Sequence, residues 1–294
     1  MQWRGRRTSR NIEDRRQAGG RRSGGGRVSG GRGRLGVGAT LVVLLIGAYL
    51  GVDVTPFLNG ASLTPSGQAP AGQTTSGRNQ IDDDQEAFVA TGLAETEAVW
   101  GTIFQASGQS YQEPVLVLYS GGTQSGCGSA QASMGPFYCP GDQRVYLDTD
   151  FFRVMQTQLQ AGGEFANAYV IAHEVAHHVQ TLTGRLGQVN AQRQRASTRE
   201  SNELSVRLEL QADCYAGIWA QRAADRLHVT DADIRQALAT AARIGDDALQ
   251  AAAGHAVVPD SFQHGSSEQR QRGFFAGFQS GDPQRCDTFA ANAL

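Results

Sequence analysis

The chain has 294 residues, which is enough for one fairly large domain or two small ones with appendages, and so for a sizeable hydrophobic core. Its formal net charge of −2 hides an asymmetry: residues 1–34 carry eleven arginines against two acidic residues, a balance of +9, and the remainder carries −11. This split excludes a uniformly charged chain and indicates two parts in different surroundings.

Residues 1–34 form the first predicted segment. The stretch GGRRSGGGRVSGGRGR that ends it is too poor in apolar residues to fold. Its arginines could in principle touch nucleic acid or anionic lipid, but a solvated signal for membrane topology is the favoured interpretation. We therefore expect residues 1–34 to be a disordered cytoplasmic tail, with no nucleic-acid partner.

Residues 35–52, LGVGATLVVLLIGAYLGV, are an uncharged run long enough to cross most of a bilayer as a helix. A cleaved secretion signal is the alternative, but the preceding region is long for one and no clear A-x-A site follows. With the arginines on its N-terminal side, the positive-inside rule places everything after Asp53 across the membrane. The sequence thus predicts a single-pass protein of the cytoplasmic membrane, with its N-terminus inside and its folded domain extracytoplasmic.

Residues 53–81 are rich in Gly, Ser, Thr, Pro and Gln and predict a flexible linker, so the folded domain is expected over residues 82–294. Hydrophobic periodicity and capping residues predict helices at about 84–105, 151–160, 164–182, 199–226 and 231–244, with another beginning near residue 266. Two short strand-like runs lie at 114–119 and 144–148. The expected fold class is α+β, mainly helical, with a small sheet.

All four cysteines fall in the domain predicted to be extracytoplasmic, where thiols tend to oxidise. Three pairings are possible, and sequence alone does not choose between them. We favour Cys127 with Cys139, which would staple a glycine-rich loop, and Cys214 with Cys286, which would tie the C-terminus to a helix. A four-thiolate zinc site is disfavoured because the spacings lack C-x-x-C pairs.

The segment AYVIAHEVAHHVQ carries the motif H-E-x-x-H at His173, Glu174 and His177, within a predicted helix. On a helix the two histidines lie about 40° apart and can point at one ion. His178 is turned about 100° away from His177 and should not reach the same ion, so a place at the surface or behind the ligands is favoured. Zinc needs neutral nitrogen ligands and leaves a position for water, whose proton a nearby carboxylate can accept. The motif alone is equally compatible with a buried core helix that happens to carry histidines.

A third ligand must come from further along the chain, and the candidates are Glu200, Glu203, Glu209, Asp213, His228, His255 and His264. In RLELQADCYAGIWA, Glu209 and Asp213 are four residues apart, so on a helix one carboxylate can bind zinc while the other accepts the free N–H of a ligating histidine. Glu209 lies among apolar residues, where an unpaired carboxylate would be costly. The favoured assignment is Glu209 as the third zinc ligand and Asp213 as the carboxylate that accepts the N–H of a ligating histidine.

Four separated motifs occur in one order: WRGRRTSRNIEDRR at 3–16, IAHEVAHHVQ at 171–180, LSVRLELQADCYAGIWA at 204–220 and HGSSEQRQRGFFAGF at 264–278. With them the chain resembles the putative neutral zinc metallopeptidase family of bacterial membrane proteins. The resemblance implies a zincin-like domain with one Zn²⁺, held by His173, His177 and Glu209, and Glu174 as catalytic base. The chain departs from the family pattern at Gly273, where an aromatic residue is expected, and this bears on local packing more than on chemistry.

The stretch HGSSEQR is also similar to the H-P-x-x-x-x-R stretch of membrane-bound peptidases of the prenyl-protein endopeptidase type. That similarity implies that His264 hydrogen-bonds the oxyanion and that Arg270 holds the oxyanion or the substrate. From the residues alone, only a helix N-cap at Ser266 is indicated, and a purely structural role for His264 stays open.

These observations together predict a membrane-anchored, zinc-dependent peptidase that acts on peptide or protein substrates, with the strand at 144–148 offering an edge to an extended substrate. The alternative is a membrane-tethered scaffold or interaction protein whose zinc site is structural or degenerate, which a closed site with four ligands would indicate. A nucleic-acid binder would need the folded domain in the cytoplasm, which the cysteines and the predicted span disfavour.

Overall fold

The computed structural model describes residues 1–16, 81, 83–131 and 135–290. The predicted membrane span at 35–52 and nearly all of the predicted linker lie outside these residues. In the part of the chain that is described, no helix has both the length and the apolar character needed to cross a membrane.

A four-stranded sheet has the order β1-β2-β6-β5, in which the first three strands are parallel and β5 is antiparallel to β6. Its strands are β1 (Ile12–Asp14), β2 (Val115–Tyr119), β6 (Arg144–Asp148) and β5 (Phe137–Cys139), and a separate hairpin consists of β3 (Gly122–Ser125) and β4 (Gly128–Gln131). The two predicted strands are confirmed as β2 and β6. The other four were not predicted because each has only three or four residues, too few to show an alternating pattern.

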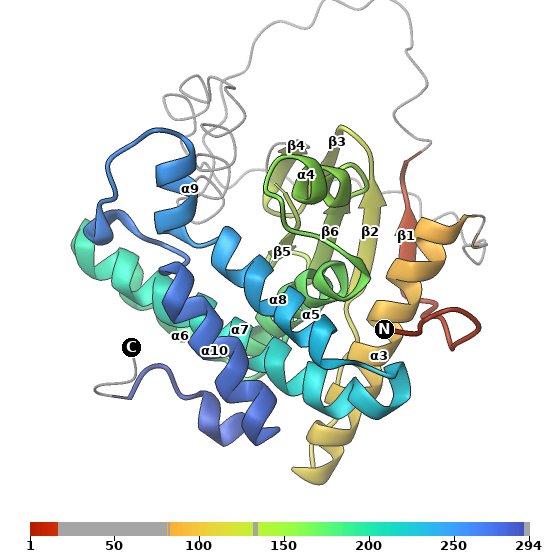
Figure 1. The fold of residues 1–294 in the computed structure, drawn as a ribbon. Coiled ribbons are helices and arrows are strands. Elements are labelled where there is room, and N and C mark those ends of the chain that lie inside the picture. The colour runs from red at the N-terminus through yellow and green to blue at the C-terminus, as the bar shows by residue number, and fades with distance from the viewer. Residues whose placement is uncertain (17–80, 82, 132–134, 291–294) are drawn as a thin grey trace, which may run out of the picture.

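The helices form most of the domain (Figure 1). They are α3 (Asp84–Ala106), α4 (Phe151–Thr157), α5 (Glu164–Leu182), α6 (Arg185–Arg193), α7 (Thr198–Leu227), α8 (Asp231–Arg243), α9 (Asp246–Ala252) and α10 (Ser267–Ser280). Each predicted helix is present, and Thr230 and Ser266 form capping boxes at the starts of α8 and α10. The short helices α6 and α9 were not predicted. The mainly helical α+β class is confirmed.

Helix α5 is the centre of the domain, because it contacts α3, α6, α7, α8 and the strands β5 and β6. Its apolar residues Phe165, Tyr169 and Val175 have no exposed surface. A helix buried on nearly all sides is hydrophobic around most of its circumference, which is why the histidines of this segment stand out against an apolar background. The H-E-x-x-H motif is thus carried by a rigid, enclosed element.

Helices α7 and α10 make the closest helix contact, and three glycines permit it. A Cβ atom on Gly277 would lie 1.8 Å from the carbonyl oxygen of Cys214, and one on Gly217 would lie 2.0 Å from that of Phe274. At Gly273 a Cβ would lie 2.9 Å from the carbonyl oxygen of Leu210. The departure from the family pattern at Gly273 therefore falls where α10 meets the backbone of α7.

The N-terminal sixteen residues are part of the folded domain, which differs from the predicted disordered tail over residues 1–34. Trp3 is 6% exposed and packs edge-on against Phe88 of α3, with ring centroids 5.5 Å apart. Ile12 is equally buried and pairs with Leu116 of β2 in the sheet. The composition of residues 1–34 as a whole concealed these two apolar anchors, since the glycine-rich half dominates it.

Replacing Trp3 with alanine should lower the free energy of unfolding by about 3–5 kcal/mol, because it removes a large buried ring and leaves a cavity beside Phe88. Chemical denaturation of the purified full chain measures this loss. Replacing the exposed Arg10 with alanine is the matched control and should change stability little. Equal stability of the Trp3 variant and the parent would mean that the N-terminal segment is not docked.

Two disulfides join Cys127 to Cys139 and Cys214 to Cys286, and no cysteine is free. The favoured pairing is therefore confirmed. The first bond links the β3–β4 hairpin to β5, and the second ties α7 to the C-terminal segment across 72 residues of sequence. A cross-link that closes so long a loop restricts the unfolded chain strongly.

Candidate metal centre

Three side chains from α5 and α7 converge on one point. His173, His177 and Glu209 each offer a ligand atom, and these atoms all lie within 4.8 Å of one another. We call these three residues the metal group. The Nε2 atom of His173 is 3.1 Å from Oε2 of Glu209, and Nε2 of His177 is 3.5 Å from Oε1. Two ligands of one tetrahedral zinc ion are separated by roughly 3.4 Å, given bonds of about 2.1 Å. The spacing of these atoms therefore fits a shared ion.

His173 is oriented by Asp213, one turn beyond Glu209 on α7. Its Nδ1 atom lies 2.9 Å from Oδ1 of Asp213. Since a carboxylate accepts hydrogen bonds, Nδ1 donates to Asp213, which leaves Nε2, 3.1 Å from Glu209, as the nitrogen that can bind an ion. Asp213 is fully buried and also accepts from the hydroxyl of Tyr169 at 2.5 Å and from Arg270. The predicted supporting role of Asp213 agrees with this placement.

The electrostatics of the cluster favour positive charge. Burial opposes ionisation of Glu209, but the neighbouring histidines outweigh it and hold the pKa of this carboxyl well below its usual range. Burial likewise opposes a charge on His173, yet Asp213 and Glu209 raise the pKa of the ring to about 10. The buried carboxylate of Asp213 and the partly buried carboxylate of Glu209, placed around imidazole nitrogens, form a donor set that a divalent cation would satisfy.

Glu174 follows the first histidine on α5 and is 9% exposed. It is not a member of the group of three ligand atoms. Burial raises the pKa of its carboxyl, although His173 and His177 oppose the change. A buried carboxyl beside the metal group, and outside it, has the placement that a proton acceptor needs.

Arg270 lies behind the metal group, on the far side of Asp213. It is 4% exposed, and its Nε and Nη2 atoms contact the two oxygens of Asp213 at 2.9 and 3.0 Å. The remaining nitrogen donates to the carbonyl of Ile244 at 3.2 Å. The guanidinium is therefore engaged in holding Asp213, which the resemblance to H-P-x-x-x-x-R peptidases did not indicate.

His264 is held by Asp246, a residue that the sequence interpretation missed. Nδ1 of His264 lies 3.0 Å from Oδ1 of Asp246, whose other oxygen accepts from the backbone N–H groups of Gln263, His264 and Gly265. Burial opposes a charge on His264, but Asp246 and, to a smaller extent, Glu209 raise the pKa of the ring. Asp246 begins α9, and the sequence offered only an acidic first turn as a signal.

The two side chains that follow the motif have separate roles. His178 faces away from the metal group: Nδ1 lies 3.1 Å from the hydroxyl of Tyr138 and Nε2 lies 2.7 Å from the carbonyl of Gln112. As expected, His178 is not one of the residues that converge with His177. Gln180, which was not predicted, lies with Oε1 at 2.9 Å from Nδ1 of His177.

The sequence matches the family described as "Putative neutral zinc metallopeptidase" over residues 1–289. The chain belongs to this family. It is 45% identical over 290 residues to the uncharacterized protein YpfJ of Escherichia coli (strain K12). The aligned region covers 98% of this chain and 99% of that relative. It is also 44% identical over 217 residues to the uncharacterized protein Rv2575 of Mycobacterium tuberculosis, covering 70% of this chain and 71% of the relative. No solved structure matches the chain.

Membership of this zinc metallopeptidase family names zinc as the cofactor, and the residues present fit it. Zinc prefers imidazole nitrogen and carboxylate oxygen, and catalytic sites commonly use two histidines and a glutamate. His173, His177 and Glu209 supply that set. The residues expected as ligands from sequence are therefore the ones that the fold brings together.

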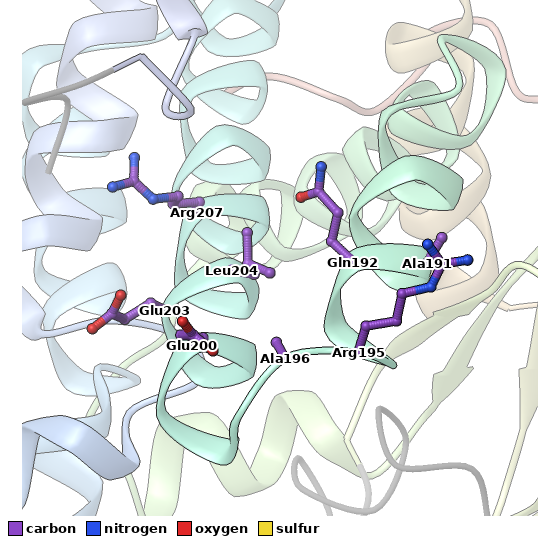
Figure 2. Close-up of a pocket in the computed structure, with 8 residues that line it drawn as sticks. All are labelled: Ala191, Gln192, Arg195, Ala196, Glu200, Glu203, Leu204 and Arg207. Atoms are coloured by element: carbon purple, nitrogen blue, oxygen red, sulfur yellow. The ribbon is translucent and has the colours of Figure 1, made fainter.

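A separate hollow of about 530 Å³ lies between α6 and α7 (Figure 2) and is lined by Ala191, Gln192, Arg195, Ala196, Glu200, Glu203, Leu204 and Arg207. At 100° per residue, the lining positions of α7 lie on the side of the helix opposite Glu209. Its charged residues carry both signs. The hollow is therefore distinct from the metal group, and Glu203, an alternative ligand, lines it and pairs with Arg199.

Proposed function

We propose that this protein is a zinc-dependent peptidase that hydrolyses peptide bonds in peptide or protein substrates. The observation that carries the proposal is the convergence of His173, His177 and Glu209 within 4.8 Å, with the buried carboxyl of Glu174 beside them. Three protein ligands are typical of catalytic zinc sites, whereas structural sites usually have four. Within the described residues the group has three members, which favours a peptidase over a scaffold with structural zinc.

A Zn²⁺ ion bound by these residues would supply Lewis acidity toward water and the scissile carbonyl. Glu174 accepts the proton of the attacking water at its carboxylate and passes it to the leaving amine. His264, held through Nδ1 by Asp246, donates a hydrogen bond from Nε2 to the developing oxyanion. Arg270 fixes Asp213, and Asp213 in turn orients His173.

The expected substrate edge needs a correction. Strand β6 lies between β2 and β5 and is hydrogen-bonded on both sides, so it has no free edge. Strand β5 is the outer strand on that side, and its Tyr138 contacts His178 of α5. An extended peptide that adds to the sheet beside α5 would therefore pair with β5.

We propose that the catalytic domain works in an oxidising, extracytoplasmic compartment of a bacterial cell and that residues 35–52 anchor it to the cytoplasmic membrane. Two disulfides within one domain support the first part, because the bacterial cytoplasm keeps thiols reduced. The uncharged sequence of residues 35–52 supports the second, but as an attachment that returns to the same side and not as a single crossing, because residues 12–14 pair with a strand of the domain.

Metal analysis of the purified full chain, combined with a peptide-library cleavage assay, tests the proposed function. We expect about one zinc per chain and cleavage that is lost on chelation and restored by added zinc. A preparation with bound zinc and no cleavage of any peptide would favour the scaffold. Cleavage that persists after complete removal of the metal would overturn the zinc mechanism.

A further inference from the structure

Gln180 is a buried amide on α5 whose two ends face different partners. Its Nε2 atom donates to the carbonyl of Leu208 at 2.8 Å and to Oε1 of Gln211 at 3.1 Å. A backbone carbonyl can only accept, so the amide nitrogen must face α7. The amide oxygen of Gln180 then necessarily faces Nδ1 of His177, at 2.9 Å.

Gln211 is oriented by the same logic. Its Nε2 atom donates to the carbonyl of Cys286 at 3.0 Å, which leaves its oxygen toward Gln180. The disulfide between Cys286 and Cys214 holds this carbonyl in place, because Cys214 lies one turn beyond Gln211 on α7. Gln180 has no exposed surface and Gln211 has 3%, so an amide turned the wrong way would leave buried polar atoms unpaired.

We propose that Gln180 is the positioning residue of His177, and that Gln211 and the disulfide-held carbonyl of Cys286 fix its direction. Nδ1 of His177 must carry a hydrogen to meet the amide oxygen, so Nε2, 3.5 Å from Oε1 of Glu209, is the nitrogen left to bind the metal. His173 is held by a carboxylate, Asp213, whereas His177 is held by a neutral amide. The effect of Gln180 on zinc affinity rests on the proposed function. The effect of Gln180 on the orientation and protonation of the His177 ring does not.

Zinc affinity of the full chain, measured by competition with a chelator, tests the role of Gln180. Replacing Gln180 with leucine should weaken zinc binding about 10 to 100-fold. Replacing it with glutamate, which keeps an acceptor toward His177, should restore part of the affinity. Gln250 is a matched control: it is a buried amide, bonded to Ser261 and Val258, and its change to leucine should leave zinc affinity unaltered. Unchanged affinity in the Gln180→Leu variant would overturn the proposal.

Nitrogen-15 NMR of histidine in the metal-free protein gives a second readout that does not depend on zinc. At a pH where His177 is neutral, its proton should be on Nδ1 in the parent protein. In Gln180→Leu the ring should populate both tautomers, with the proton on Nδ1 or on Nε2. In Gln211→Leu the change in these populations should be smaller. A parent protein with the proton on Nε2 would overturn the inference. Failure to bind zinc with the expected tautomer present would instead contradict the proposed function alone.

A separate observation concerns the N-terminal segment. Its polar residues pair with buried carboxylates of α3: Arg7 contacts Oε2 of Glu97 at 3.0 Å, and Asn11 donates to Oε1 at 2.9 Å. Glu97 is 4% exposed, and the segment continues into β1, which is hydrogen-bonded to β2. These contacts lie on the same body that carries the metal centre, as α3 contacts both α5 and α7.

We infer that residues 1–16 and the catalytic domain occupy the same side of any membrane. Paired strands cannot be separated by a hydrocarbon layer roughly 30 Å thick. A cytoplasmic N-terminus and an extracytoplasmic domain, as the arginine distribution predicts, cannot both hold while β1 pairs with β2 of the same chain.

Single cysteines at Arg10 and at Ala251, both exposed positions, test this inference in the full chain. A membrane-impermeant maleimide applied to intact spheroplasts should label both positions or neither. After lysis the maleimide should label both positions. The parent protein is the control and should not react, because its four cysteines are paired. Labelling of one position together with protection of the other until lysis would overturn the inference.

Discussion

Replacing Glu174 with glutamine is expected to abolish peptide cleavage while zinc remains bound. The amide has nearly the shape of the carboxylate but cannot accept the proton of the attacking water, a role worth about 10² to 10⁴-fold in rate. Glu174 lies outside the group of three ligand atoms, so the change removes no coordinating atom. Cleavage rate and metal content, measured on the same preparation, check both halves of the prediction.

Glu203→Gln is the matched control for this variant, because Glu203 is an exposed glutamate of α7 that pairs with Arg199. It should retain full activity. If Glu174→Gln stayed active, the mechanism with a glutamate base would have to be abandoned, since Glu209 is engaged with both histidines. Loss of zinc from Glu174→Gln would instead show that Glu174 is a ligand.

Replacing any one of His173, His177 and Glu209 with alanine is expected to remove both zinc and activity. Each change deletes one of three protein ligands, and the affinity of a chelate falls steeply with the number of its donors. Zinc content after dialysis against a weak chelator measures this loss. Stoichiometric zinc and full activity in Glu209→Ala would show that the third-ligand assignment is wrong, and Asp213 would become the next candidate.

Asp213 should behave differently from the three ligands. Asp213→Asn keeps an acceptor for His173 and should cost about 10 to 100-fold in metal affinity or rate. Asp213→Ala also leaves Arg270 as an unpaired buried cation and should lower the free energy of unfolding by about 3–5 kcal/mol. Comparing the two variants by denaturation and metal titration separates orientation of the ring from loss of stability.

Short-range spacing explains why much of the candidate site could be predicted. His173 and His177 share a face because four residues on a helix advance by slightly more than one turn, and Glu209 and Asp213 share a face for the same reason. Gln180 follows His177 at a three-residue spacing and could have been found by the same rule. These relations are local and need only the presence of helices α5 and α7.

Contacts between distant segments were harder to predict. The ring of His264 meets Asp246 across 18 residues, and Arg270 meets Asp213 across 57. The resemblance to other peptidases suggested that Arg270 faces the substrate, yet the close approach of α10 to α7 at Gly273 places its guanidinium on Asp213. Such partners depend on how helices cross, which local periodicity does not encode.

The sequence by itself determined six of the helices, the H-E-x-x-H pair and the two carboxylates on α7, because each depends on residues within one or two turns. The tertiary structure alone decided which strand is free at the sheet edge, which acceptor orients His177, and that residues 1–16 join the catalytic domain. Trp3 and Ile12 find their places only against α3 and β2, about 80 to 100 residues further along the chain. These two side chains are buried against surfaces that exist only in the folded domain. The composition of the N-terminal segment therefore could not reveal their burial.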